Sequence, residues 1–370
     1  MATLYSMNIK IAVLLHVFVC SQLKFTYEKD VFHTLQNGES TDDEIITSFK
    51  RHHMLKKRQI SNSSSGIFRT ADNQDFNKTK SNETPQYTGN VVIENHGYYT
   101  SKVITKPPDF NEYWVDLNNA KGHEDLVKEY RKAIRVNLNF EFRFYGNNVT
   151  KIYIANSGFL SMAQFPHQYL TATQYIAPLM ANFDPTISEG SNIFYKDFGD
   201  RFVVEWKNLY LQDKNDTTPF HFQTTLHANG TIYFAYKQIP VEVSEIDTNN
   251  HPVKVGVSDA YYMDFTRQGV KRRTIYEYNR LEIDFKLVRS GTVVILIPLK
   301  TCNIAKDCTT CLTQDDSFDC KWCPMVGRCS DGLDWLRQEW LDQDCDRKAF
   351  DDSGKCNISA KEPENNTLSS

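Results

Sequence analysis

The fold of this chain is decided by residues 134–144, whose sequence is IRVNLNFEFRF. Apolar and polar residues alternate strictly through this stretch, and Tyr145-Gly146 ends it. A period of two residues is the signature of a β-strand with one buried and one solvated face. The segment therefore predicts a long strand lying on a hydrophobic core.

Further strand candidates lie on both sides of short turn-like segments downstream of this run. Asn229-Gly230 separates two of them and tolerates the positive φ values of a tight hairpin turn. Short strands with intervening turns predict a mainly β domain over residues 109–300, built as an antiparallel sandwich or barrel. One window, Ala120–Ile134, has partial helical spacing. The strand candidates are Lys151–Ala155, Asn192–Tyr195, Phe202–Trp206, Phe220–His227, Thr231–Tyr236, Val253–Val257, Leu281–Leu287 and Thr292–Pro298.

Composition narrows the class of protein. The 370 residues are 40% hydrophobic, 24% charged and 13% aromatic, which is typical of a globular chain rich in β structure. Lys plus Arg is 42 against 46 for Asp plus Glu, a formal net charge of -4. This balance argues against a nucleic-acid partner, because such proteins neutralise phosphates with excess basic residues.

The N-terminus and the cysteines indicate the secretory pathway. Lys10 precedes an apolar run, Ile11–Cys20, that ends in small residues, which predicts a signal peptide over residues 1–21. Its removal takes away Cys20 and leaves eight cysteines, an even number that suits an oxidising compartment. The longest apolar stretch beyond it, Val293–Pro298, is far short of the roughly 20 residues that cross a bilayer.

Polar segments flank the expected folded part. Residues 22–108 carry no sustained period and predict a disordered arm that ends at Lys106-Pro107-Pro108, and residues 358–370 form a polar tail. Asn-x-Ser/Thr acceptors predict N-glycosylation, which requires exposed backbone. They begin at Asn62, Asn77, Asn82, Asn148, Asn215, Asn229, Asn357 and Asn365.

Residues 301–357 hold all eight remaining cysteines, with the spacing C-x5-C-x2-C-x8-C-x2-C-x5-C-x15-C-x10-C. A segment this small needs covalent staples to hold a fold, and eight cysteines allow 105 pairings that spacing alone does not resolve. The alternative is a zinc site. It would use Cys308, Cys311, Cys320 and Cys323, but the intervening loop is short and four cysteines would be left over.

Cys320-Lys321-Trp322-Cys323 within this ladder resembles the C-x-W-C hallmark of the plexin-semaphorin-integrin (PSI) module. The resemblance implies a packing role for Trp322 and a spacer role for the module. It also implies four disulfides, Cys302–Cys320, Cys308–Cys356, Cys311–Cys329 and Cys323–Cys345.

The preceding domain resembles the extracellular nidogen-like domain through a series of short motifs in order. A nidogen-like region joined to a PSI module is similar to the plexin domain-containing proteins, also called tumour endothelial markers, over about Phe110–Phe350. That family implies a type I membrane receptor or adhesion protein, whereas this chain ends at Ser370 without an apolar segment after the module. The motifs are Phe142–Gly146, Ile152–Ile154, Asn156–Ser161, Ile176–Pro178 and Asn182–Asp184.

An enzyme is not expected. The sequence has no G-x-S-x-G, H-E-x-x-H or P-loop motif, and its histidines lack metal-ligand spacing, so we expect no metal and no cofactor. His221 and His227 flank one strand candidate and fit ordinary surface positions better than a site. Asp184 and Asp197 could form the carboxylate pair of a carbohydrate-active enzyme, but turn-forming acids are the better interpretation.

A secreted or cell-surface binding protein fits best, with a matrix or secreted protein as its extracellular ligand. Eight Lys and Arg against 14 Asp and Glu after Thr301 make the cysteine module and tail an acidic spacer. We therefore expect the ligand on the β domain, at loop Gln164–Thr173 or loop Tyr261–Arg273. A secreted structural matrix protein without a signalling role is the alternative. The candidate contact residues of the second loop are Tyr261, Tyr262, Lys271, Arg272 and Arg273.

Overall fold

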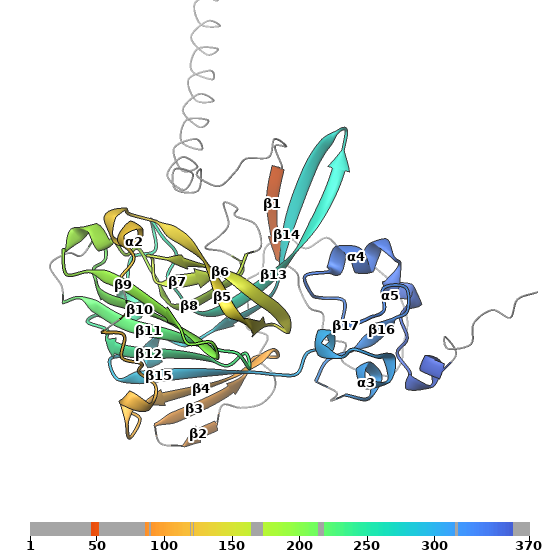
Figure 1. The fold of residues 1–370 in the computed structure, drawn as a ribbon, viewed down its shortest axis with the longest axis horizontal. Helices are drawn as coiled ribbons and strands as arrows, with labels where there is room; N and C mark the ends of the chain where they lie inside the picture. The colour runs from red at the N-terminus through yellow and green to blue at the C-terminus, as the bar shows by residue number, and fades with distance from the viewer. Residues whose placement is uncertain are drawn as a thin grey trace, which may run out of the picture.

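The computed structural model describes residues 46–51, 86–88, 90–118, 120, 122–163, 173–213, 218–314 and 317–357. The predicted signal peptide 1–21, most of the arm and the tail 358–370 lie outside these residues. The described chain forms a β body followed by a small module (Figure 1).

The body consists of two sheets that form a sandwich, which confirms the predicted mainly β class. One sheet has the spatial order β1 (Ile46–Arg51), β14 (Val270–Glu282), β13 (Lys254–Arg267), β8 (Tyr175–Met180), β7 (Phe159–Ser161), β6 (Asn147–Ala155) and β5 (Ala133–Phe144). The other has the order β2 (Gln86–Thr88), β3 (Val91–Asn95), β4 (Tyr99–Thr105), β15 (Thr292–Pro298), β12 (Ile232–Gln238), β11 (Phe220–His227), β10 (Arg201–Leu209) and β9 (Asn192–Asp197). Neighbouring strands pair antiparallel, except that β1 pairs parallel to β14.

The alternating run that predicted the fold is β5. Leu138, Phe142 and Phe144 are buried in the main core, and Phe140 packs partly buried against it. Trp206 of β10 lies in the same core and donates its indole N–H to the carbonyl oxygen of Ala155, at 3.0 Å. This bond joins the two sheets across the sandwich, so the apolar face of β5 is one wall of a single core.

The prediction that residues 22–108 form a disordered arm is wrong for its last part. β3 and β4 belong to the second sheet, where β4 pairs along its whole length with β15. Tyr99 and Val103 of β4 are buried, whereas Lys102 between them is not. The alternation of apolar and polar residues in β4 is too short to stand out in the sequence. Its partner strand, β15, lies almost 190 residues further along the chain.

Two further expectations about local structure hold only in part. Within the described residues of the helical window Ala120–Ile134, the helix is the short α2 (Glu124–Lys128), because β5 already begins at Ala133. The strand candidate Leu281–Leu287 spans the end of β14 and the 3-10 helix η4 (Phe285–Leu287), which Asp284 caps by accepting the N–H of Lys286. The other short 3-10 helices of the body are η1 (Phe110–Glu112), η2 (Pro185–Ile187) and η3 (Val243–Glu245).

The strands β7, β8 and β14 were not predicted. Every residue of β8 is buried, because β8 lies inside its sheet and both of its faces are covered. A strand of this kind shows no alternation of apolar and polar residues, so it gives no period-2 signal. The predicted turn at Asn229-Gly230 is present between β11 and β12, where Gly230 has a φ of +89°.

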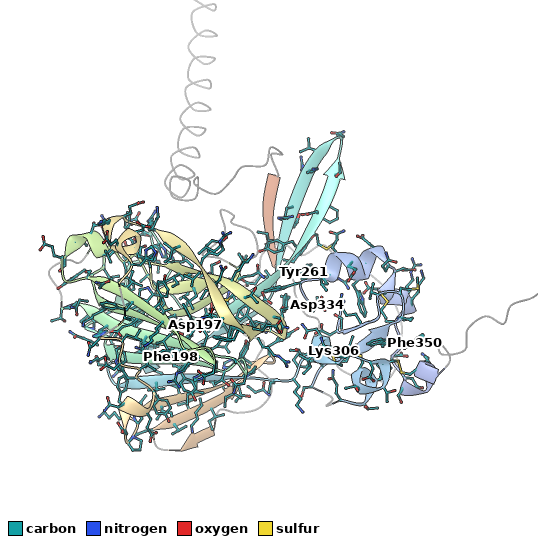
Figure 2. The ribbon with its side chains drawn as sticks, in the orientation of Figure 1. Asp197, Phe198, Tyr261, Lys306, Asp334 and Phe350 are labelled. Carbon is teal, nitrogen blue, oxygen red and sulfur yellow. A yellow bond between two sulfur atoms is a disulfide. The ribbon has the colours of Figure 1, made fainter. Side chains whose placement is uncertain are left out.

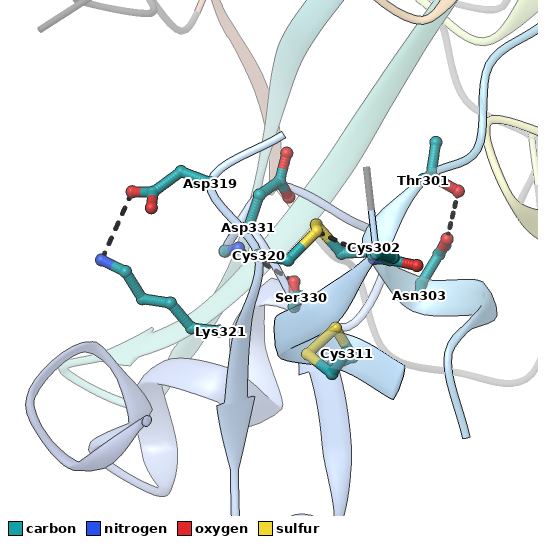
Figure 3. Close-up of a disulfide and its surroundings, with 12 residues drawn as sticks. Thr301, Cys302, Asn303, Cys311, Asp319, Cys320, Lys321, Ser330 and Asp331 are labelled. Carbon is teal, nitrogen blue, oxygen red and sulfur yellow. Dashed lines mark hydrogen bonds and ion pairs between the residues drawn. A yellow bond between two sulfur atoms is a disulfide. The ribbon is translucent and has the colours of Figure 1, made fainter. Parts of the chain in front are cut away.

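The cysteine module follows β15 directly and contains only short elements. Its disulfides join Cys302–Cys320, Cys308–Cys356, Cys311–Cys329 and Cys323–Cys345, the pairs that the PSI resemblance implies. Figure 3 shows the first bridge, next to the bond between the Thr301 hydroxyl and Asn303. The elements are η5 (Cys302–Ile304), α3 (Cys308–Thr313), β16 (Lys321–Cys323), β17 (Arg328–Ser330), α4 (Arg337–Asp342), α5 (Cys345–Lys348) and η6 (Ser353–Asn357).

Candidate binding surface

The segment expected to be a contact loop, Tyr261–Arg273, is instead the outer part of a long β-hairpin formed by β13 and β14. Arg267 pairs with Val270, so only Gln268 and Gly269 form the turn, with φ values of 52° and 77°. Two consecutive positive φ values match the primed turns that suit the twist of a hairpin. The hairpin projects out of the body, past the end of β8 (Figure 1).

Within the part of the chain that the structure describes, side-chain amides rather than a strand contact the projecting edge of β13. β8 pairs with β13 only as far as Ser258. Beyond that point the carbonyl oxygen of Ala260 accepts the side-chain N–H of Gln174, at 3.0 Å. The N–H of Asp264 donates to the side-chain oxygen of Gln338 on α4, at 2.8 Å. The cysteine module therefore takes part in holding the hairpin.

Several of the predicted contact residues are engaged within the protein, as Tyr261, Tyr262 and Arg273 show. Tyr261 is only 4% exposed and stacks on Tyr276, with ring centroids 5.2 Å apart, so its prediction as a contact residue is wrong. Tyr262 donates its hydroxyl to Gln174. Arg273 lies over the Tyr262 ring and makes a bidentate ion pair with Asp264, with both N–O distances 2.7 Å.

The exposed part of the hairpin is nearer its tip and is partly apolar. Lys271 and Arg272 are exposed, as predicted. Phe265 and Val270 are 46% and 39% exposed, which is unusual for large apolar side chains. The neighbouring helix α4 adds Leu341 and the preceding Leu336, at 37% and 50%.

Four of the seven large apolar side chains that are exposed within the described part of the chain thus lie on two elements that contact each other. We call these and the two basic residues the hairpin–α4 surface. Exposed apolar groups that gather in this way mark interaction sites more often than scattered ones do. Its members are Phe265, Val270, Lys271, Arg272, Leu336 and Leu341.

The hairpin–α4 surface spans a junction at which the body and the module share buried polar contacts. Figure 2 labels Tyr261 on the body and Asp334 on the module, where the two meet. Tyr98 donates its hydroxyl to Asp331, at 3.0 Å, and its ring packs against Phe318 with centroids 4.9 Å apart. Asn303 bonds to the Tyr145 carbonyl oxygen, at 3.4 Å. A cavity of about 10 Å³ lies among these side chains, enough for about one water.

Asp259 of β13 is the most deeply buried acid of this junction. The indole N–H of Trp335, from the module, lies 2.9 Å from each carboxylate oxygen. Gln174 donates to Oδ1 at 2.9 Å, and the Tyr278 hydroxyl donates to Oδ2. Burial raises the pKa of Asp259 to about 7, although the hydrogen bonds from Tyr278, Gln174 and Trp335 favour the charged form.

The cysteine sulfurs are arranged as disulfides rather than as metal ligands. The sulfurs of Cys302, Cys320 and Cys329 lie within 4.8 Å of one another, but each belongs to a bridge. The cysteines of the zinc alternative are also bridged, each in a different disulfide. A thiolate is the species that binds zinc, so this arrangement does not provide the ligands. Trp322 packs partly buried against the small core of the module.

The other sequence candidates occupy structural positions. Asp184 caps η2, and Asp197 accepts the N–H groups of Asn139 and Gly199, so each acid serves a turn or strand end. The expectation of a surface position is wrong for His221, which forms a buried pair with Glu205, with the ring nitrogen 2.7 Å from the carboxylate. His227 is partly buried beside the Tyr233 ring.

Two predicted glycosylation acceptors can be placed. Asn148 on β6 and Asn229 in the β11–β12 turn are both exposed, as N-glycosylation requires. Asn357 ends η6, and its side chain is not among those described. The acceptors Asn62, Asn77, Asn82, Asn215 and Asn365 lie outside the described residues, as does the loop Gln164–Thr173 except for the buried Thr173.

Sequence reasoning missed the groups that join the two parts. Asp259 lies 76 residues from Trp335 and 85 residues from Gln174 along the sequence. Gln338 is similarly 74 residues from the Asp264 amide that it caps. No local pattern announces such contacts, because each side chain alone looks like an ordinary surface residue.

Residues 111–281 match a protein family described as NIDO related. No solved structure matches the chain. The chain thus contains a NIDO-related domain followed by a cysteine-rich, disulfide-bonded region, a combination that indicates an extracellular, nidogen-like protein. Among the described residues, no helix has the length and apolar character needed to cross a membrane.

Proposed function

We propose that this protein is an extracellular, non-enzymatic binding protein of the plexin domain-containing type, with a receptor or adhesion role. Its ligand is a matrix or secreted protein, which binds at the hairpin–α4 surface. The cysteine module acts as a PSI-type spacer that fixes the direction of whatever it joins to the β domain.

The observation that carries this proposal is the gathering of exposed apolar side chains on a projecting hairpin and the adjoining α4. Protein interfaces combine an apolar centre with polar groups around it, and aromatic and Arg side chains contribute most of their binding energy. Phe265 and Leu336 supply the apolar centre. Arg272 pairs with Phe265 and adds a cationic group on the same face of the hairpin, whereas Lys271, paired with Thr266, lies on the opposite face.

Charge points to the character of the partner. The hairpin tip, residues 264–273, contains four Lys and Arg against one Asp, although the chain as a whole is slightly acidic. Complementary charge steers association and excludes partners of the wrong sign. We therefore expect a protein partner that presents an apolar patch beside acidic side chains.

The test uses the full chain, expressed in a secretory host, and surface-immobilised fibronectin, laminin and fibrillar and network collagens. The variant Phe265→Ser with Leu336→Ser should weaken binding to the recognised protein at least tenfold. Phe198→Ser is the matched control, because Phe198 is also an exposed aromatic but lies on the β9–β10 turn of the body (Figure 2). The control should leave binding unchanged.

Two results would contradict the proposal. One is that none of these matrix proteins binds at micromolar concentration. The other is that the Phe198 control weakens binding as much as the double variant does, which would place the contact elsewhere on the body.

A further inference from the structure

The junction between the β body and the cysteine module is built around one carboxyl group. Asp259 belongs to the body and is fully buried, yet Trp335 of the module donates to both of its oxygens. The carboxyl group is buried in part by the module itself, so separation of the two parts would expose it to water.

The groups that touch Asp259 can accept either of its protonation states. The Trp335 and Gln174 nitrogens only donate hydrogen bonds, and they can share Oδ1. The Tyr278 hydroxyl can both donate and accept. When Asp259 gains a proton on Oδ2, that proton is donated to the Tyr278 oxygen, and the hydroxyl of Tyr278 turns away.

The surroundings disfavour a negative charge at this position. Among the described residues, the titratable side chains that interact with Asp259, directly or through Tyr98, are tyrosines or acids, and burial raises the pKa of Asp331 as well. The nearby Arg328 is paired to Asp334 instead, and Arg273 to Asp264. The tyrosines and acids that interact with Asp259 are Tyr98 just before β4, Tyr99 at the start of β4, Tyr145 after β5, Tyr262 of β13, Tyr278 of β14, and Asp331 and Asp334 of the module.

We propose that the junction is a proton-sensitive joint, in which Asp259 takes up a proton while body and module are docked and thereby strengthens their docking. The direction of the effect follows from linkage. A state that holds a proton more tightly is favoured as the pH falls, and the docked state buries Asp259 more than a separated one. Burial is the largest influence on the pKa of Asp259 and exceeds that of the Trp335 hydrogen bond, which favours the charged form. The pKa of about 7 places the transition near neutral pH.

The joint also controls the geometry of the hairpin, because Gln338 of the module caps the Asp264 amide. Loosening of the joint above neutral pH would release this cap and move α4 away from the hairpin. That the joint thereby regulates ligand binding rests on the proposed function. The joint itself does not, since it can be measured without any ligand.

The experiment follows the Trp335 indole N–H by NMR in the full chain labelled with ¹⁵N-tryptophan, from pH 5 to 8.5. The chain has five tryptophans, and Trp335→Phe assigns the signal. We expect its ¹H shift to titrate with one midpoint between pH 6 and 8, and to stay constant in Asp259→Asn. The Asp264 amide should also lose protection from hydrogen exchange at least threefold between pH 6 and pH 8, after correction for the intrinsic rate.

A constant Trp335 shift in the unchanged protein, or a titration that persists in Asp259→Asn, would overturn the proposal. If Asp259→Asn is not secreted, Tyr278→Phe serves instead. It removes a hydrogen bond that stabilises the charged form, so the midpoint should rise by at least half a pH unit. A midpoint that stays in place would equally overturn it. A missing matrix ligand would leave these readouts unaffected, so the two proposals can fail separately.

Discussion

The side-chain oxygen of Gln338 on α4 accepts the backbone N–H of Asp264 on β13, at 2.8 Å. This contact places a side chain of the cysteine module where a neighbouring strand would otherwise lie. An uncapped strand edge presents unpaired backbone groups that invite other chains to pair with it. The module therefore protects the edge of the projecting hairpin.

Gln338→Leu should expose this edge without disturbing the body, because leucine has a similar size but accepts no hydrogen bond. We expect the Asp264 amide to exchange at least fivefold faster in hydrogen exchange measured by NMR. Amides in β11, in the middle of the second sheet, serve as the internal reference and should keep their rates. Unchanged exchange at Asp264 would show that the cap is not formed in solution.

Gly158→Ala should disrupt the turn between β6 and β7. Gly158 has a φ of +80°, and an added Cβ would lie 2.0 Å from the carbonyl oxygen of Leu179. Gly199→Ala is the matched control, because its φ is +88° but nothing lies within 4 Å of the new atom. The control should cost about 1 kcal/mol, as expected for a left-handed residue.

The cost of Gly158→Ala should exceed that of the control by at least about 2 kcal/mol, because backbone must move to relieve the clash. Denaturant unfolding of both variants measures the difference. Equal costs would mean that the Leu179 carbonyl group moves aside easily.

Cys323→Ala with Cys345→Ala should destabilise the module by about 3 kcal/mol or more. The bridge closes a loop of 22 residues, and both cysteines are fully buried next to Trp340. The comparison is Cys308→Ala with Cys356→Ala, which opens a longer loop of 48 residues at less buried positions. Chain entropy alone makes the second pair costlier by about 0.7 kcal/mol.

We nevertheless expect the loss of the Cys323–Cys345 bridge to cost more. Its removal also leaves a cavity in the small core around Trp340. Urea unfolding followed by the fluorescence of the module tryptophans checks this. If the longer loop proves costlier, the entropy of the unfolded chain outweighs packing at this bridge.

Asp259 should make the unfolding free energy fall as the pH rises from 5 to 7.5. Its folded pKa of about 7 lies above the unfolded value, so the folded state holds a proton that the unfolded state has lost in this interval. The stabilisation is complete below about pH 4 and is lost as the pH passes through 7. Integrating the linkage relation gives a loss of about 2 to 3 kcal/mol.

Denaturant unfolding at several pH values should show this decrease in the unchanged protein and a flatter profile in Asp259→Asn. The difference between the two profiles isolates Asp259 from other acids, such as Asp331, whose pKa is also raised by burial and which acts in the same direction. Parallel profiles would show that Asp259 does not bind a proton in this range.

β5 could be predicted from sequence because it alternates apolar and polar residues over 11 positions. The candidates Phe220–His227 and Thr292–Pro298 also coincide with β11 and β15, although most of their residues are buried, because both are runs rich in apolar and β-branched residues. Prediction failed for other strands. β8 is buried on both faces, and β3 and β4 are short and paired with a strand far along the chain.

The candidate surface was predictable only in part. The basic residues Lys271 and Arg272 are exposed near the tip of the hairpin. Tyr261 and Arg273 look the same in the sequence but are engaged by Tyr276 and Asp264. Whether an aromatic or basic side chain is available depends on what lies across the strand pair.

The sequence alone determined the class of the protein: a β-rich domain and a disulfide-stapled module, because alternation and cysteine spacing are local properties of the chain. Only the tertiary structure decided how the two parts meet. The burial of Asp259 under Trp335, and the capping of Asp264 by Gln338, join residues more than 70 positions apart. Such contacts arise from the packing of complete surfaces, and no short stretch of sequence carries them.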